Sequence, residues 1–261
     1  MMRNLVLFDE PQIREQLYPF SLTHSIGAFR TGIATIAEKW EYYLQGKSSF
    51  LTEDYLQEKY PLRLMEDNWF IAAHVLPDDN LVNAVLQLQI GEALFHQQQL
   101  LAFRGAHWDD RMQPVARLLY EDGITAIYHP FHIFQLNGAQ LIKDITWLTK
   151  DRSSQSLSRS TIIFGNYPVF VEEGATITAC ILNAEQGPVY IGKNATIMEG
   201  ACIRGPFAML ENSVVKMGSK IYGATTLGPY CIAGGEIKNT VFFGYSNKSH
   251  TGYLGDAVIG E

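Results

Sequence analysis

Polar side chains that could carry out proton transfer and anion binding are concentrated in residues 238–256. His250 is the only histidine after residue 132, and its sequence neighbours are polar or charged. An unperturbed imidazole has a pKa of about 6.5, so it can accept a proton at neutral pH. Lys238 and Lys248 supply cations for an anionic group, and Tyr253 supplies a hydrogen-bonding phenol. We interpret this stretch as a candidate site with a general base. The alternative is an exposed histidine without a role.

A repeat of six residues must position this stretch. Stepping by six meets eight consecutive aliphatic or small residues: Ile191, Ile197, Ile203, Met209, Val215, Ile221, Leu227 and Ala233. Positions four residues after each of them are mostly small. Such hexads form the sides of triangular coils that stack into a parallel β-helix, with the aliphatic side chains inside. We therefore predict a β-helix over residues 161–261, with these aliphatic residues buried.

The repeat is interrupted at residues 183–189 and again between residues 238 and 256. At the second interruption the step of six is lost, which favours a loop that leaves the coil. Loops raised on a rigid scaffold are frequent functional sites, and His250 lies in this one.

Residues 1–150 have a different pattern, and residues 151–160 separate them from the repeats. Apolar runs predict strands at residues 5–8, 69–73, 100–103 and 124–128, and helical spacing predicts helices at 32–45, from 77–80 onward and at 131–145. Residues 108–111 predict a turn. Strands that alternate with helices predict an α/β domain with parallel strand pairs. Residues 150–160 hold five serines and four charges, which is typical of a solvated linker.

Composition excludes several classes of protein. Of the 261 residues 47% are apolar, which excludes bulk disorder, and the net charge of −7 without a basic run argues against nucleic acid or anionic membranes as partners. No apolar stretch approaches 18 residues, and an acid at residue 9 argues against a signal peptide. Three widely spaced cysteines, Cys180, Cys202 and Cys231, indicate buried, reduced thiols in a cytoplasmic protein.

Residues 248–260, KSHTGYLGDAVIG, resemble a motif of the bifunctional N-acetylglucosamine-1-phosphate uridyltransferase and glucosamine-1-phosphate acetyltransferase family. Residues 235–239, GEIKN, fit the same family, and the chain resembles more closely a bacterial variant of it with a divergent first domain. The resemblance implies a nucleotidyltransferase-like (Rossmann-like) α/β domain followed by a left-handed parallel β-helix. It also implies UDP-N-acetylglucosamine synthesis for cell envelope biosynthesis, coupled to acetyl transfer from acetyl-coenzyme A.

The same match implies a role for four residues of the β-helix. His250 would be the general base of acetyl transfer, and Tyr253 would contact the sugar phosphate. Lys238 matches a phosphate-binding lysine, and Lys220 lies where the family has a phosphate-binding arginine. A lysine there keeps the charge but loses the planar, two-pronged guanidinium.

The first part of the chain departs from the family pattern. The usual glycine-rich loop after the first strand, whose backbone N–H groups hold phosphates, is replaced by residues 9–12, DEPQ. The variant group implies instead that Arg30 and Lys39 hold nucleotide phosphates; the alternatives are a structural arginine and a solvated helix charge. Asp78 follows a predicted strand, where the family often places a Mg²⁺-binding aspartate. A helix N-cap is the simpler interpretation of Asp78.

Three functional hypotheses follow. The first is a bifunctional enzyme that uses a sugar 1-phosphate, a nucleoside triphosphate and Mg²⁺, and that assembles as a homotrimer as the family does. Because the last hexad is incomplete, we expect the acetyl-coenzyme A site of that family to be incomplete in these 261 residues. The second is a hexapeptide acetyltransferase with another acceptor; a β-helix carbonic anhydrase would need three metal-binding histidines where only His250 is available. The third is a non-catalytic trimeric scaffold.

Overall fold

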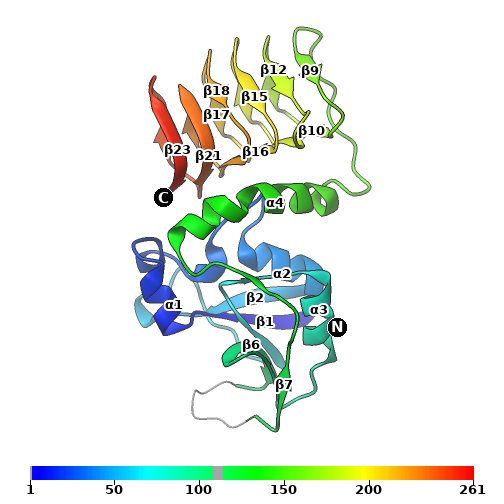
Figure 1. Cartoon of the computed structure of the whole chain (residues 1–261), viewed down its shortest axis with the longest axis vertical. Coiled ribbons are helices and arrows are strands. Elements are labelled where there is room, and N and C mark those ends of the chain that lie inside the picture. Colours follow the sequence, from blue (N-terminus) through cyan, green and yellow to red (C-terminus); the bar gives the residue numbers. More distant parts are fainter. Residues whose placement is uncertain (1, 108–113) are drawn as a thin grey trace. The chain divides into compact units, whose positions relative to one another are not determined.

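The chain forms two compact units in a computed structural model that describes residues 2–107 and 114–261 (Figure 1). Unit 1 contains Met1–Phe29 and Thr35–Pro130, and unit 2 contains Arg30–Ala34 and Phe131–Glu261. The mixed α/β architecture with a solenoid of parallel strands is the one predicted from the sequence. The turn expected at residues 108–111 lies outside the described residues.

Unit 1 is built on a six-stranded sheet. The strand order is β2 (Gly46–Leu51), β1 (Arg3–Phe8), β3 (Asn68–Ala72), β6 (Gln99–Gly105), β5 (Glu92–His96) and β7 (Ala116–Leu119). Strands β1, β2 and β3 are parallel, β6 is antiparallel to both β3 and β5, and β7 is parallel to β5. Every strand except β6 therefore ends at the same edge of the sheet. The strand predicted at residues 124–128 is the short β8 (Thr125–Ala126), which pairs with β4 (Val75–Leu76).

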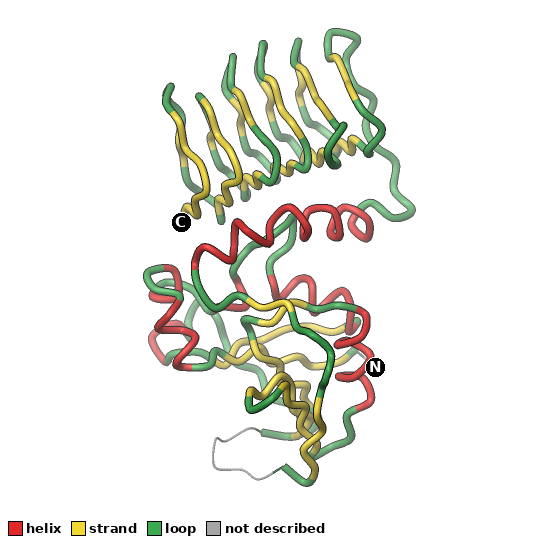
Figure 2. Tube along the Cα trace, viewed as in Figure 1, coloured by secondary structure: helices red, strands yellow, loops and turns green. Residues whose placement is uncertain are grey.

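Helices of unit 1 flank this sheet (Figure 2). They are α1 (Pro11–Gln16), α2 (Ile36–Leu44) and α3 (Asp79–Gln87), with the short 3₁₀ turns η1 (Phe20–Leu22), η2 (Ile26–Ala28) and η3 (Asp54–Leu56). The helix predicted from residue 32 begins only at Ile36. The reason is a capping box, in which Thr35 and Glu38 satisfy each other's backbone N–H groups and so mark the first turn.

Unit 2 is the predicted solenoid, together with the long helix α4 (Pro130–Leu148). Its strands are β9 (Ile162–Phe164), β10 (Val169–Val171), β11 (Thr176–Ile177), β12 (Ile181–Asn183), β13 (Val189–Ile191), β14 (Thr196–Ile197), β15 (Cys202–Arg204), β16 (Phe207–Met209), β17 (Val214–Val215), β18 (Lys220–Ile221), β19 (Thr225–Leu227), β20 (Ile232–Ala233), β21 (Glu236–Phe242), β22 (Asn247–Lys248) and β23 (Tyr253–Ile259). All eight residues of the six-step series are at most 1% exposed, so the repeat prediction is confirmed.

The second interruption of the repeat is a shortened coil, and the prediction of a loop leaving the coil there is wrong. The coils just before it pair residues eighteen positions apart, such as Ile203 with Ile221, but Ile221 pairs with Ile237, only sixteen positions on. Strand β21 passes a corner without a break and pairs with both β18 and β19. The chain therefore keeps its backbone pairing while it loses the step of six.

Two smaller expectations for unit 2 also need correction. Cys180 and Cys231 are buried as predicted, but Cys202 is exposed, because it points outward from β15 beside the inward Ile203. The serine-rich segment is exposed but is not simply a solvated spacer, since the Ser154 hydroxyl accepts a hydrogen bond from the Val171 N–H (2.9 Å). The segment thus lines the first coil of the solenoid.

Candidate active site

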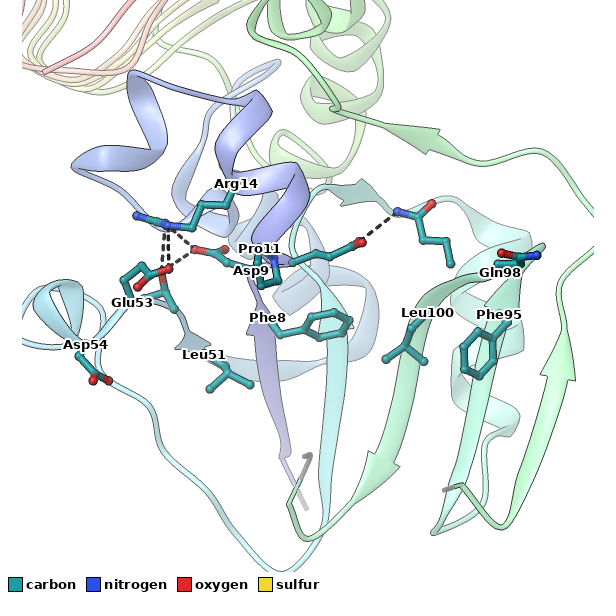
Figure 3. A pocket seen from close by; sticks show the side chains of 13 residues that line it. Phe8, Asp9, Pro11, Arg14, Leu51, Glu53, Asp54, Phe95, Gln98 and Leu100 are labelled. Carbon is teal, nitrogen blue, oxygen red and sulfur yellow. Dashed lines mark hydrogen bonds and ion pairs between the residues drawn. The ribbon is translucent and has the colours of Figure 1, made fainter. Parts of the chain in front are cut away.

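A cavity of about 740 Å³ opens at the edge of unit 1 where β1 and β2 end (Figure 3). Its apolar lining comes from Phe8, Leu51, Phe95 and Leu100. Its polar lining comes from Asp9, Glu10, Arg14, Thr52, Glu53, Asp54, Gln98 and Gln99. In open α/β sheets ligands bind outside the carboxyl ends of the strands, and this cavity lies at that edge.

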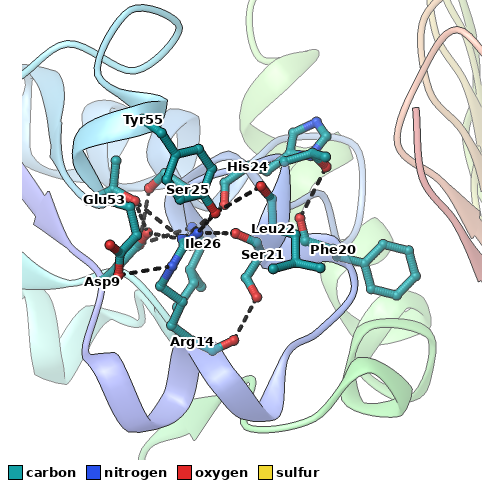
Figure 4. Close-up of polar contacts among 12 residues, drawn as sticks. Asp9, Arg14, Phe20, Ser21, Leu22, His24, Ser25, Ile26, Glu53 and Tyr55 are labelled. Carbon is teal, nitrogen blue, oxygen red and sulfur yellow. Dashed lines mark hydrogen bonds and ion pairs between the residues drawn. The ribbon is translucent and has the colours of Figure 1, made fainter.

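Asp9, the first residue after β1, is a buried carboxylate whose two oxygens are both occupied (Figure 4). One oxygen accepts from the Ser25 hydroxyl and the Ile26 N–H, each at 3.0 Å. The other accepts from the Thr52 hydroxyl at 2.5 Å and from Arg14 at 3.1 Å. Burial raises the pKa of Asp9, although these hydrogen bonds and the Arg14 charge act in the opposite direction. Asp9 therefore fixes the wall of the cavity.

Arg14 in α1 is the second buried charge of this wall, and the sequence analysis missed it. Its guanidinium bonds to Asp9, to the Tyr55 hydroxyl (2.8 Å) and to the backbone oxygens of Ser21 and His24. It also lies 3.6 Å from a carboxylate oxygen of Glu53, measured from Nε. These contacts tie α1 to the segment at residues 21–24 and to the loop after β2. The available signal was an acid and an arginine five residues apart, on either side of a helix start at Pro11.

A second polar group lies around Gln99, where the β5–β6 hairpin reaches the cavity. The Tyr128 hydroxyl donates to Gln99 Oε1 (2.9 Å), and Gln99 Nε2 lies 2.5 Å from His74 Nε2 and 3.5 Å from Glu10 Oε2. Burial lowers the pKa of His74 to about 4, so the ring is neutral at pH 7. The sequence analysis assigned no role to these residues, which come from four separate segments.

The three residues predicted for nucleotide and metal binding do not line this cavity. Arg30 belongs to unit 2, is 8% exposed and donates to the backbone oxygen of Ile33. Lys39 is 1% exposed within α2, so its interpretation as a solvated helix charge is wrong. Asp78 accepts the Leu81 N–H at 2.9 Å, which confirms the N-cap interpretation. Binding of phosphate by Arg30 and Lys39 and of Mg²⁺ by Asp78 stays a prediction.

The residues predicted for acetyl transfer lie on neighbouring strands of the solenoid. Lys220 pairs with Glu236, and Glu236 pairs with Tyr253, so the three point outward beside one another. Lys238, two residues after Glu236, shares this outward side, and His250 is exposed in the turn between β22 and β23.

Lys248 does not supply the cation that we expected beside His250. Its ammonium donates to the backbone oxygens of Gly234 (2.7 Å), His250 (2.7 Å) and Gly252 (2.6 Å). These three acceptors use the three donors of the ammonium group. Lys248 therefore holds the turn that carries His250.

Divalent-metal binding can be tested against the carboxylates of the cavity. Residues 2–107 and 114–261 contain no cluster of three or more His, Cys, Asp or Glu side chains placed to hold a metal ion. Mg²⁺, however, is often held by one or two carboxylates together with substrate phosphates. Glu53 and Asp54 offer carboxylates of this kind, so the cavity fits a Mg²⁺ ion that arrives with phosphate groups.

Comparison with known proteins gives a family for the first part of the chain. The profile of the sugar nucleotidyl transferase family matches residues 5–153, which is more than half of the 261 residues and includes all residues of the cavity. No curated protein matches the chain. Within the described residues, no helix combines the length and the apolar character needed to cross a membrane. The chain belongs to the sugar nucleotidyl transferase family.

Proposed function

We propose that the cavity of unit 1 joins a sugar 1-phosphate to a nucleoside triphosphate and releases pyrophosphate. The observation that carries this proposal is the position of the cavity, at the carboxyl ends of β1 and β2 within the segment that matches the family. A phosphate oxygen of the sugar 1-phosphate attacks the α-phosphorus, the bond to the β-phosphate breaks, and pyrophosphate leaves.

The apolar side chains of the cavity would bind the substrates, and its charged side chains would bind the metal ion and hold the wall. Phe8, Leu51 and Leu100 offer an apolar surface for a base or a sugar face. Four carboxylates face one arginine, so a triphosphate needs a cation to enter. Mg²⁺, held by Glu53 or Asp54 and by the phosphates, would offset the charge on the phosphate oxygens. Asp9 and Arg14 hold the wall in place, which favours alignment of the two substrates.

We propose UTP and N-acetylglucosamine 1-phosphate as the substrates, on the resemblance of residues 235–260 to the bifunctional family. Pyrophosphate release is measured with a panel of nucleoside triphosphates and sugar 1-phosphates. Glu53→Gln should lower turnover, whereas Glu66→Gln, an exposed carboxylate outside the cavity, should not. Normal turnover in Arg30→Ala would remove Arg30 from the site. If no pair of substrates releases pyrophosphate, the non-catalytic scaffold is favoured.

A second activity, acetyl transfer to glucosamine 1-phosphate, is proposed for the outward side of β18, β21 and β23. The supporting observation is the register of β18, β21 and β23, which brings Lys220, Lys238 and Tyr253 onto neighbouring strands, with His250 three residues before Tyr253. The amine nitrogen attacks the thioester of acetyl-coenzyme A, the thiolate leaves, and His250 accepts the ammonium proton. In a chain that carries the further coils of the bifunctional family, His250→Ala should lower kcat by roughly 10²–10⁴ and leave acceptor binding intact. Lys238→Ala should mainly weaken acceptor binding. Equal acetylation without the imidazole would refute this role.

We further propose that the solenoid mediates a homotrimer. Large apolar side chains are exposed on it, among them Met217 (69% exposed), and the exposed rings of Tyr230 and Tyr245 stack with centroids 5.2 Å apart. A stable monomer in light scattering at micromolar concentration would contradict this assembly.

A further inference from the structure

The cavity of unit 1 has two chemically different ends (Figure 3). Arg14, Glu53 and Asp54 lie at one end, where charges of both signs meet. Gln98, Phe95 and Leu100 lie at the other end. Gln99 stands between Gln98 and Leu100 in the chain, and its Nε2 lies 3.5 Å from Glu10 Oε2, so the Glu10 carboxylate is directed toward this end. Among the described residues that line the cavity, Arg14 is the one cation, and it lies at the first end; Arg117 lies over the Phe95 ring, 4.0 Å from its centroid, but does not line the cavity. The second end therefore suits the uncharged part of a substrate better than its phosphates.

The orientation of the Gln99 amide follows from its three neighbours. The Glu10 carboxylate lies 3.5 Å from the atom assigned as Nε2, and a carboxylate can only accept. If the amide were flipped, its oxygen would face that carboxylate and two acceptors would repel. The Tyr128 hydroxyl then donates to Oε1, and Nε2 donates to His74 Nε2. The network has one self-consistent direction.

His74 and Tyr128 hold this direction at neutral pH because neither ionises there. His74 is fully buried, and burial lowers its pKa to about 4, so its ring stays neutral and Nε2 accepts. Its Nδ1, which then carries the ring proton, has no hydrogen-bond partner among the described residues. The pKa of Tyr128 is raised, chiefly by burial, so its hydroxyl keeps the proton that it donates. The Gln99 amide is thus a fixed donor at the cavity.

Glu10 has open acceptor capacity, a property that it shares with Asp54, but Asp54 lies at the end of the cavity that holds Arg14. Both oxygens of Asp9 are occupied, and Glu53 faces Arg14. Among the described residues, Glu10 receives a single long contact from Gln99. A phosphate next to it would be repelled, whereas a hydroxyl group can donate to it and accept from a neighbouring amide.

We propose that Glu10, positioned by Gln99, binds hydroxyl groups of a sugar ring and is the residue by which the cavity recognises its sugar. This inference deepens the proposed nucleotidyl transfer and rests on it. Two substrates carry such hydroxyls, the ribose of the nucleotide and the hexose of the sugar 1-phosphate. Gln99 acts through Glu10 and is a positioning residue, held in turn by His74 and Tyr128.

The experiment compares each substrate with its deoxy analogue in steady-state pyrophosphate release. For Glu10→Gln we expect KM for the recognised substrate to rise roughly 10- to 100-fold, with kcat nearly unchanged, since one hydrogen bond to a charged group is weakened. The ratio of kcat/KM for the hydroxyl-bearing substrate to kcat/KM for its deoxy analogue should fall toward one in this variant. Loss of preference with 2′- or 3′-deoxynucleotides identifies the ribose, and loss only with deoxyhexose 1-phosphates identifies the hexose. Glu66→Gln, the matched exposed carboxylate, should behave as wild type.

Gln99→Leu tests the positioning role separately. It should raise the same KM without changing kcat, and the double variant with Glu10→Gln should add little to Glu10→Gln alone, because both changes remove one interaction. Unchanged hydroxyl preference in Glu10→Gln, or a fall in kcat that is equal for both analogues, would overturn the proposal. If the wild type releases no pyrophosphate, calorimetric binding of the same analogues replaces turnover. Loss of sugar binding in Glu10→Gln would then support the inference although the proposed function had failed.

Discussion

His74 makes the stability of unit 1 depend on pH between about 6.5 and 4. The pKa of the buried imidazole is lowered to about 4, whereas an unfolded histidine has a pKa of about 6.5. The neutral form is therefore favoured by folding, so this stability is fully present above pH 6.5 and is lost as the pH falls toward 4. At pH 5.0 the unfolded ring is almost fully protonated but the folded ring is about one-tenth protonated. Linkage then gives a loss of about 2 kcal/mol between pH 7.5 and pH 5.0, and about 3 kcal/mol once both forms are protonated.

The assay is urea unfolding followed by tryptophan fluorescence in a Trp147→Phe background. Of the four tryptophans, the three that remain are Trp40, Trp69 and Trp108, all within the residue ranges of unit 1. His74→Gln keeps a hydrogen-bond acceptor but does not titrate, so its stability should fall about 2 kcal/mol less than that of wild type over this range.

The matched control is His107→Gln, which changes an exposed histidine and should follow the wild-type pH dependence. A constant difference between wild type and His74→Gln at every pH would refute the reasoning. It would show that the buried ring does not change its protonation between the folded and unfolded states.

Three other substitutions probe separate parts of the fold. Arg14→Met leaves the buried Asp9 carboxylate without its cation and should cost about 3–5 kcal/mol in urea unfolding, with a smaller cost when Asp9→Asn is added. Thr35→Ala removes the capping box of α2 and should cost about 1 kcal/mol in the same measurement; no change would mean that the cap is dispensable. Leu227→Ala empties a fully buried solenoid position and should cost about 2–5 kcal/mol in thermal unfolding, whereas Glu199→Gln, on the exposed surface of the solenoid, should stay within about 0.5 kcal/mol.

Local periodicity was enough to predict the solenoid, because each hexad contributes one inward residue whatever the rest of the chain does. The same reasoning failed at the shortened coil. A coil of eighteen residues would pair Ile221 with position 239, but the residue that pairs with it is Ile237, two positions earlier. There the backbone pairing continues, and only the count of residues at a corner changes. A prediction that depends on a constant spacing of six residues therefore cannot distinguish a shorter corner from a loop that leaves the coil.

The cavity could not be predicted in the same way, since its polar groups meet only after the sheet has formed. Asp9 and Thr52 are 43 residues apart and become neighbours because β1 and β2 run side by side and end together. Lys39 shows the converse, because a charged residue in an amphipathic helix looked solvated although the folded chain buries it. Burial of a charge depends on partners far away in sequence, which helix periodicity does not report.

The segment Arg30–Ala34 belongs by its contacts to unit 2, although both of its chain neighbours belong to unit 1. Within unit 2, the Gly32 N–H donates to Asn137 (2.6 Å), the Gly32 oxygen accepts from the Thr226 hydroxyl (3.0 Å), and Asp144 accepts the N–H of Ile33 (2.7 Å).

The contact between Gly32 and Thr226 can form only late in synthesis of the chain. Thr226 follows Gly32 by 194 residues, and at 5–20 residues per second it is made roughly 10 to 40 seconds later. During that time residues 30–34 lack the hydrogen bond from Thr226 to the Gly32 oxygen, however much of unit 1 has already folded. On a ribosome stalled before residue 226, the Gly32 oxygen would still lack the Thr226 hydroxyl as its hydrogen-bond donor.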